Sequence, residues 1–324
     1  MAIFCVTGGT GFIGKNLIHL LTTLGHDVRI LSRSQAHLST GRVNYYHLDL
    51  LDSATDFSDF LFEADVLIHC AGEVENKAKM SALHIDATAR LIEAVKTSVF
   101  LTGVRLHWVQ LSSCGVYGAS ANIEAVTRIK VVTEDYPTAP VGVYEITKLA
   151  SENIVRQKMT GELLTHSILR ASNVFGKNMP NQSLFRLISA IKSGYFFYLG
   201  RQEVISTYVH VDDVSRALLL LSIDGRARGE IYNLSNSCSL KSLVECISRL
   251  LKKTSAPVHL PTRLVMSVWH FASVLVRPWR RLPSLNFLIS SVSYPATKIK
   301  RDLDFTFSRA MPDSISELIG VNVK

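Results

Sequence analysis

The sequence lacks most features that mark secreted, metal-binding or membrane-spanning proteins. Its five cysteines form no CxxC pair, and its 11 histidines show no HExxH spacing. We therefore expect no disulfide framework and no metal site, and a reducing compartment fits the cysteine usage best. The N-terminus has no basic segment or cleavage site of a signal peptide, and no uncharged apolar run reaches the roughly 18 residues of a spanning helix. These absences predict a cytoplasmic protein, soluble or peripherally bound to the inner face of the membrane.

Acidic residues are missing from one long stretch of the chain. Residues 246–301 contain ten Lys or Arg and no Asp or Glu, which leaves 25 basic and 27 acidic residues elsewhere. The net charge of +8 therefore arises entirely from this stretch. Nucleic-acid binders usually combine such charge with a recognisable motif, and none is present. We expect no nucleic-acid partner.

Short apolar runs alternate with helical patterns in the first half of the chain. The expected strands are residues 3–6, 28–31, 45–48, 66–70, 106–111 and 165–169, and the expected helices lie near 13–24, 78–100 and 143–159. Strands rich in Val, Ile and Leu that alternate with helices predict an α/β fold with a doubly wound parallel sheet. The alternation breaks up after residue 170. We predict a dinucleotide-binding domain over residues 1–170 and a smaller, mostly substrate-binding C-terminal lobe over residues 171–324.

The motif TGGTGFIG (residues 7–14) lies between the first expected strand and the first expected helix. Gly8 permits a tight turn, Gly11 lets the backbone approach a diphosphate, and Gly14 lets the helix pack closely on the strand. The helix N-terminus then offers free N–H groups and a positive dipole to phosphates. This arrangement predicts a Rossmann-type dinucleotide site that also includes Phe12 and Ile13. A glycine-rich turn without a ligand is the alternative.

The second expected strand ends in LSRS, where NAD-binding proteins of this fold carry an acidic residue for the ribose 2′-hydroxyl. Ser32 takes that place and Arg33 follows it. A hydroxyl and a guanidinium suit a 2′-phosphate better, so NADP is slightly favoured over NAD. A surface arginine without a role in cofactor choice fits the same residues.

The motif YEITK places Tyr144 and Lys148 one helical turn apart on the same face. An ammonium near a phenol lowers the phenol pKa and makes it an acid or base for alcohol–ketone chemistry. The motif LSSCGVYG (residues 111–118) ends another expected strand and brings the Ser113 hydroxyl to the carboxyl edge of the sheet. A YxxxK spacing alone is also typical of a solvated helix face.

The chain resembles the extended short-chain dehydrogenases/reductases of the NAD(P)-dependent nucleotide-sugar epimerase/dehydratase family. The resemblance extends from residue 2 to about 235, and weakly to the end through SYPATKIKRDLDF. The motifs that carry it, in order, are TGGTGFIG, HCAG (residues 69–72), LSSCGVYG, YEITK, LRASNVFG (169–176) and YVHVDDV (208–214).

The resemblance implies a catalytic role for three residues. Ser113 matches the residue that hydrogen-bonds the sugar oxygen, Tyr144 the proton-transferring tyrosine, and Lys148 the lysine that holds the nicotinamide ribose. Asn173 matches a residue that often contacts substrate. Further cofactor contacts are implied for Asp49 and Leu50 near the adenine, for Cys70, Ala71 and Gly72 along the cofactor, and for Tyr144 and Lys148.

Three positions depart from the family pattern. His84 stands where the family usually has asparagine, and Ser206 where many members have an arginine that binds the substrate diphosphate. Cys114 and Gly115 replace the Asp-Glu pair of the 4,6-dehydratases. The last departure argues against dehydration and leaves epimerisation, reduction or alcohol oxidation.

Residues 262–281 form a basic amphipathic segment in which polar residues follow one helical stripe. A lobe helix buried against the main domain, a dimer-forming helix, and an interfacial helix on anionic headgroups all fit this pattern.

The resemblance implies a sugar 4-epimerase or 4-ketoreductase acting on a nucleotide-linked sugar, in surface polysaccharide biosynthesis. A membrane-associated 4-epimerase of a polyprenyl-diphosphate-linked sugar and a hydroxysteroid-type alcohol dehydrogenase are the enzymatic alternatives. A non-catalytic cofactor sensor is the third class. We expect a homodimer, because the helices near 78–100 and 143–159 pair in related proteins.

Overall fold

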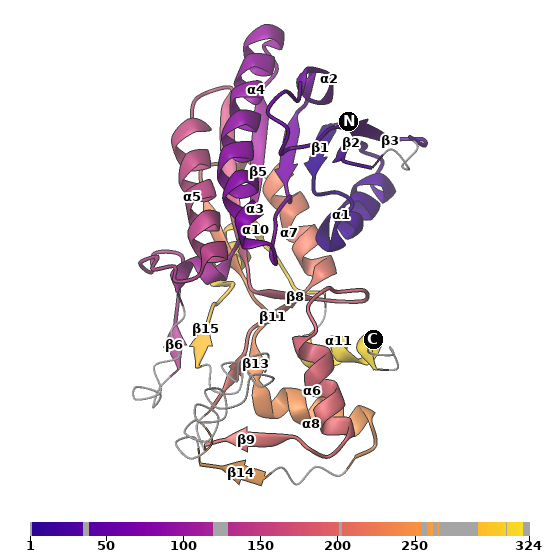
Figure 1. Ribbon diagram of the computed structural model, residues 1–324, viewed down its shortest axis with the longest axis vertical. Coiled ribbons are helices and arrows are strands. Elements are labelled where there is room, and N and C mark those ends of the chain that lie inside the picture. Colours follow the sequence, from indigo (N-terminus) through magenta and orange to yellow (C-terminus); the bar gives the residue numbers. More distant parts are fainter. Residues whose placement is uncertain are drawn as a thin grey trace.

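The protein is described from a computed structural model. The structure describes residues 2–34, 39–118, 129–200, 203–253, 258–261, 265, 291–308 and 310–319. Figure 1 shows two layers: a sheet between helices, and a smaller group of helices and short strands below it.

The upper layer is built on a parallel sheet. Within the described ranges it has seven strands in the order β12-β7-β5-β4-β1-β2-β3. The strands are β1 (Ile3–Thr7), β2 (Asp27–Ser32), β3 (Val43–His47), β4 (Val66–His69), β5 (Leu106–Ser113), β7 (Leu164–Ala171) and β12 (Ile231–Leu234). The predicted Rossmann-type α/β fold is confirmed.

Helices cover both faces of the sheet. One face carries α1 (Phe12–Thr23) and α7 (Val211–Ile223), and the other carries α2 (Ser58–Leu61), α4 (Ala87–Thr102) and α5 (Val143–Lys158). Successive strand residues point to opposite faces, so both faces of the central strands must be apolar. In β1, for example, Phe4 and Val6 pack under α1, whereas Cys5 belongs to the core under α4.

The predicted helix over residues 78–100 exists, but it is not uniform. It consists of α3 (Lys77–Ser81), a π-helical turn η1 (Ala82–Asp86) and α4, which follow each other without a break. A π turn inserts one extra residue into a helix and is frequent at functional sites. The turn includes His84, and all three segments, α3, η1 and α4, pack on α5.

Elements from beyond residue 170 join both layers. β12 pairs with β7, and α7 and α10 (Thr297–Leu303) contribute to the same core as β1. Residue 170 therefore does not separate the sheet layer from the smaller layer. The assignment of the smaller layer to substrate binding stays a prediction.

The smaller layer has its own apolar core. Its helices are α6 (Ser183–Lys192), α8 (Leu240–Leu250), α11 (Met311–Ser314) and the 3₁₀ turn η6 (Ile315–Leu318). Its strand pairs are β8 (Asn173–Phe175) with β11 (Tyr208–His210), β10 (Ile205–Ser206) with β13 (Cys238–Ser239), and β9 (Phe197–Leu199) with β14 (Val258–Leu260). The remaining elements are the pair β6 (Lys130–Val131) with β15 (Val292–Ser293) and the 3₁₀ turns η2 (Cys114–Tyr117) and η3 (Gly225–Ala227).

The basic segment 262–281 lies outside the described residues except for Val265. The two described ends of the acid-free stretch lie in different layers, since α8 belongs to the smaller core and α10 to the sheet core. In α10, Lys298 pairs with Glu230 at 2.7 Å. Within the described ranges, no helix combines the length and apolar character needed to cross a bilayer.

Candidate active site at the carboxyl edge of the sheet

The glycine-rich turn connects β1 to α1 and packs against the segment that follows β4. Gly8 has φ +69°, and a Cβ there would lie 2.6 Å from the backbone N of Ala71. A Cβ on Gly14 would collide with the carbonyl oxygen of Gly8. Both glycines are thus needed for close backbone approach. The N-cap of α1 is Gly11, which provides no side-chain cap, so the first N–H groups of the helix are available to an anion.

A cavity of about 240 Å³ opens beside this turn. Among the predicted cofactor residues, those that line it are Gly8, Gly11, Ser32, Arg33, Asp49, Leu50, Cys70, Ala71 and Gly72. The sequence reasoning missed Thr10, Leu31, Leu51, Glu73, Lys79 and Leu83, which also line it. The three leucines are indistinguishable from core residues in the sequence, and no motif marks Lys79.

Five predicted cofactor residues do not line this cavity: Tyr144 and Lys148, which are described below, and three residues at the start of α1. Phe12 packs against the core of the smaller layer, Ile13 packs against the sheet core, and Gly14 lies against the turn itself. A direct contact of these side chains with a cofactor stays a prediction.

The catalytic residues predicted from the motifs lie together at the same sheet edge. Ser113 ends β5, and its Oγ accepts a hydrogen bond from the backbone N of Gly115 at 3.1 Å. Tyr144 is half-buried, and its hydroxyl is close enough to Ser113 for the two to interact. Lys148 is buried one turn along α5, and its Nζ donates to the carbonyl oxygen of Leu111 at 3.1 Å. A Cβ on Gly72 would lie 3.2 Å from that Nζ, so the ammonium also faces the segment after β4.

Burial controls the charge states of this group. It lowers the pKa of Lys148 to about 8. It raises the pKa of Tyr144, and the nearby Ser113 side chain acts in the opposite direction. The sequence predicted a lowered tyrosine pKa because of the nearby ammonium. In the structure, removal of the phenol from water is the largest influence on the pKa of Tyr144, and it raises this pKa.

His84 connects the segment after β4 to α5. Its Nε2 accepts a hydrogen bond from the backbone N of Glu73 at 2.9 Å, and its Nδ1 lies 2.8 Å from Oγ1 of Thr147. Burial lowers the pKa of His84 to about 4, so the ring is neutral at pH 7 and carries its proton on Nδ1. Thr147 in turn donates to the carbonyl oxygen of Val143, in the first turn of α5.

A buried polar network supports α5 from the opposite side. Arg170 and Glu152 form an ion pair at 2.6 Å, with both side chains almost fully buried. Arg170 also donates to the Tyr117 hydroxyl at 2.8 Å, and that hydroxyl donates to Oδ1 of Asn233 at 2.9 Å. The partners lie 18 to 116 positions apart in the sequence, so no local pattern identifies this network.

The predicted substrate residue Asn173 lies at the start of β8 and is exposed. Its backbone N and its Nδ2 both donate to the carbonyl oxygen of Thr207, at 3.3 and 3.2 Å. Ser206, at the position of the family arginine, is buried in β10. A contact of either residue with substrate stays a prediction.

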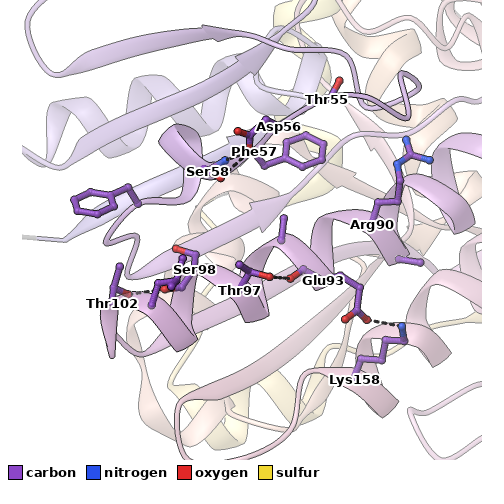
Figure 2. A pocket seen from close by; sticks show the side chains of 14 residues that line it. Thr55, Asp56, Phe57, Ser58, Arg90, Glu93, Thr97, Ser98, Thr102 and Lys158 are labelled. Atoms are coloured by element: carbon purple, nitrogen blue, oxygen red, sulfur yellow. Dashed lines mark hydrogen bonds and ion pairs between the residues drawn. The ribbon is translucent and has the colours of Figure 1, made fainter.

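A cavity of about 600 Å³ lies elsewhere, between α2 and α4 (Figure 2). Its walls include Asp56, Ser58, Arg90 and the ion pair of Glu93 with Lys158 at 2.6 Å. None of the predicted site residues lines it. The described part of the chain contains no cluster of His, Cys, Asp or Glu that could hold a metal ion.

The chain is similar in sequence and in fold to several known proteins. The dTDP-glucose 4,6-dehydratase of Salmonella typhimurium strain LT2 is 26% identical over 266 residues, covering 74% of this chain and 73% of that protein. A second relative, from Stigmatella aurantiaca, is the 4-hydroxy-2-methyl-3-oxo-4-farnesyl-3,4-dihydroquinoline-1-oxide ketoreductase. It is 25% identical over 314 residues, which cover 93% of this chain and 90% of that protein. The UDP-glucuronic acid 4-epimerase of Bacillus cereus, solved in complex with NAD, has the same fold. Its TM-score is 0.70 at 19% identity, over 97% of this chain and 96% of that one.

Residues 4–235 match the family model described as the NAD dependent epimerase/dehydratase family. The match spans more than half of the chain and contains the glycine-rich turn and the three residues predicted to be catalytic. The resemblance inferred from the motifs is therefore confirmed, and the protein belongs to the NAD dependent epimerase/dehydratase family.

Proposed function

We propose that the protein is an NAD(P)-dependent 4-epimerase or 4-ketoreductase that exchanges hydride at C4 of a nucleotide-linked sugar, in surface polysaccharide biosynthesis. The observation that carries the proposal is the convergence of Ser113, Tyr144 and Lys148 at the sheet edge that holds the cofactor cavity. A hydroxyl, a phenol and a buried ammonium are the groups that proton transfer between an alcohol and a ketone requires.

The residues around the cavity fit a dinucleotide. The uncapped start of α1 and the side chains of Arg33 and Lys79 offer positive charge to phosphates, and the glycine backbone leaves room for them. When bound, the nicotinamide supplies the acceptor or donor of the hydride.

Each catalytic residue has a separate task in this proposal. Tyr144 moves the proton of the sugar hydroxyl, and Ser113 holds the sugar oxygen through a hydrogen bond. Lys148 carries a positive charge below pH 8 and orients the nicotinamide ribose. The neutral His84 bridge keeps the first turn of α5, and with it Tyr144, in a fixed position relative to the cofactor cavity.

The turn after β5 supports epimerisation or reduction rather than dehydration. Cys114 is buried, donates its Sγ hydrogen to the carbonyl oxygen of Arg170 at 3.1 Å, and has a raised thiol pKa because of burial. Gly115 has no side chain. Neither position of the turn therefore offers an ionised group for the elimination of water.

The assay that tests the proposal follows UDP-glucose, UDP-galactose and a nucleotide-linked 4-keto sugar with purified protein and NAD(H) or NADP(H). We expect interconversion of the first two or reduction of the third. Tyr144→Phe is expected to abolish turnover and to leave cofactor affinity unchanged. Turnover that survives in this variant contradicts the assigned mechanism.

A membrane-associated function on an apolar or lipid-linked substrate is the second candidate. It is supported by the acid-free stretch over residues 246–301 and by the farnesyl group in the name of the relative that covers 93% of this chain. Flotation with vesicles tests it: binding to phosphatidylglycerol but not to phosphatidylcholine supports it. Absence of binding at low salt to either vesicle rules it out.

We also propose a homodimer through α4 and α5. The end of α4 exposes Phe100 and Leu101, at 87% and 75%. Light scattering after size exclusion is expected to give twice the monomer mass, and Leu101→Lys is expected to reduce that mass to the monomer value.

A further inference from the structure

Glu145 follows Tyr144 directly and is held at the reacting end of the site. It is the third residue of α5, and its Oε2 accepts hydrogen bonds from the backbone N of Gly142 at 2.8 Å and of Val141 at 3.0 Å. This is the carboxylate half of a capping box, which satisfies free N–H groups at a helix start. Because these two hydrogen bonds hold Oε2 of Glu145, the position of the other carboxylate oxygen, Oε1, is also fixed.

The side chain of Glu145 occupies the space next to Gly115 and Ser113. A Cβ built on Gly115 would lie 3.1 Å from Cγ of Glu145, 3.6 Å from its Oε1, and 3.3 Å from Oγ of Ser113. Gly115 does not have a positive φ, so its backbone does not require glycine. What requires a small residue at this position is the close approach of Glu145. The carboxylate and the Ser113 hydroxyl, which is proposed to hold the sugar oxygen, thus both lie beside Gly115.

The charge of Glu145 acts on Tyr144, and the described part of the chain places no counter-ion beside it. Its negative charge contributes to the raised pKa of Tyr144. Among the described side chains, no cation pairs with Glu145 and no hydrogen bond reaches Oε1. An ionised carboxylate is an acceptor only, and it repels other anions. Oε1 is thus suited to a neutral donor group of the substrate.

We propose that Oε1 of Glu145 accepts a hydrogen bond from a hydroxyl of the reacting sugar and selects neutral hexoses over uronic acids. The inference rests on the proposed function and specifies its substrate class. A uronic acid brings a second carboxylate to the reacting ring, and its repulsion by Glu145 weakens binding. A hydrogen bond to a charged acceptor in such a site discriminates by about 10- to 100-fold.

The test compares UDP-glucose with UDP-glucuronic acid, measuring both Kd by calorimetry and kcat/KM. Glu145→Gln keeps a side-chain oxygen for the helix cap but removes the charge and replaces Oε1 by an NH₂ donor. We expect the wild-type protein to favour the neutral sugar, and Glu145→Gln to reduce that preference by about tenfold or more. Glu162→Gln is the matched control, because Glu162 precedes β7 at the opposite edge of the sheet. It is expected to leave the preference unchanged.

The outcomes separate this inference from the proposed function. A change of preference in Kd without turnover of either sugar supports the role of Glu145 and contradicts the proposed reaction. Turnover with the same preference in wild type and Glu145→Gln overturns the role of Glu145 alone, and failure of both sugars to bind overturns both. A purely structural role in the cap would lower the Tm of Glu145→Ala and affect the two sugars equally.

Discussion

Among the three residues that we propose to be catalytic, Lys148 has the pKa nearest to neutral pH. Burial lowers its pKa to about 8, so its ammonium is present at pH 7 and is lost as the pH rises above 8. If the ammonium orients the cofactor ribose, the Kd of NAD(P)H rises by about tenfold between pH 7 and pH 9.5. Fluorescence titration of the reduced cofactor measures this. Lys158→Met, on the exposed end of the same helix, serves as control, and a pH-independent Kd in the wild type contradicts the assignment.

We propose that Arg33 gives the protein a slight preference for NADP. It lines the cofactor cavity next to the buried Ser32, in place of the acidic residue typical of NAD binders. Arg33→Asp is expected to weaken NADPH relative to NADH by at least about tenfold, because a bidentate contact to phosphate is lost. A selectivity that does not change would show that Arg33 is only a surface residue.

The sequence predicts residues whose role depends on local spacing, and it misses those whose role depends on contacts across the fold. Tyr144 and Lys148 are one helical turn apart, and Ser113 ends a strand, so both facts are visible in the motifs. Glu145 resembles a solvated helix residue in the sequence. Only the folded structure shows that the Glu145 side chain lies beside the turn at Gly115.

His84 links the segment after β4 to α5, and on the α5 side this link depends on the Thr147 hydroxyl. Thr147 is the described partner of Nδ1 of His84. Thr147→Val leaves that N–H buried without an acceptor and is expected to reduce stability by about 1–3 kcal/mol. Thr147→Ser retains the hydroxyl and is expected to lose much less. Urea denaturation compares the two variants, and equal losses would assign the effect to packing instead.

The helix that carries His84 shows the limit of what hydrophobic periodicity can predict about helix geometry. Its apolar pattern predicts one helix over residues 78–100, and the structure has three consecutive segments with a π turn at 82–86. The turn brings His84 to Glu73 and Thr147, which are 11 and 63 positions away. A helical pattern alone gives no information about such partners.

At the scale of the whole molecule, buried histidines make the fold sensitive to acid. Burial lowers the pKa of His69 to about 3 and of His84 and His107 to about 4. Below pH 6.5 the unfolded chain binds protons that the folded chain does not, so stability falls as the pH falls toward 4. Each histidine is expected to cost on the order of 2 kcal/mol between pH 7 and 5.

Denaturation at the two pH values measures this loss. His84→Asn, which restores the usual family residue, is expected to remove about one histidine's share of it. Stability that is equal at pH 7 and 5 in the wild type would contradict the buried neutral state of these rings.

The overall architecture was predictable for the first half of the chain and only partly for the second. The alternation of apolar strands and helices predicts the sheet, because parallel strands that are buried on both faces are nearly continuous apolar runs in the sequence. β12 and α7 return to the sheet layer from beyond residue 170, next to β7 and α1. Strand order depends on crossover connections, and a four-residue strand such as Ile231–Leu234 carries too little pattern to reveal its neighbour.

The central claim is that Tyr144 and its neighbours promote hydride exchange at C4 of a nucleotide-linked sugar. Incubation of the protein with stoichiometric oxidised cofactor and UDP-glucose deuterated at C4, followed by mass spectrometry of the cofactor, tests it directly. The account predicts deuterium on the nicotinamide or on the epimeric sugar for the wild type, and none for Tyr144→Phe with the cofactor still bound. Binding of both ligands by the wild type with no transfer of deuterium would contradict the account.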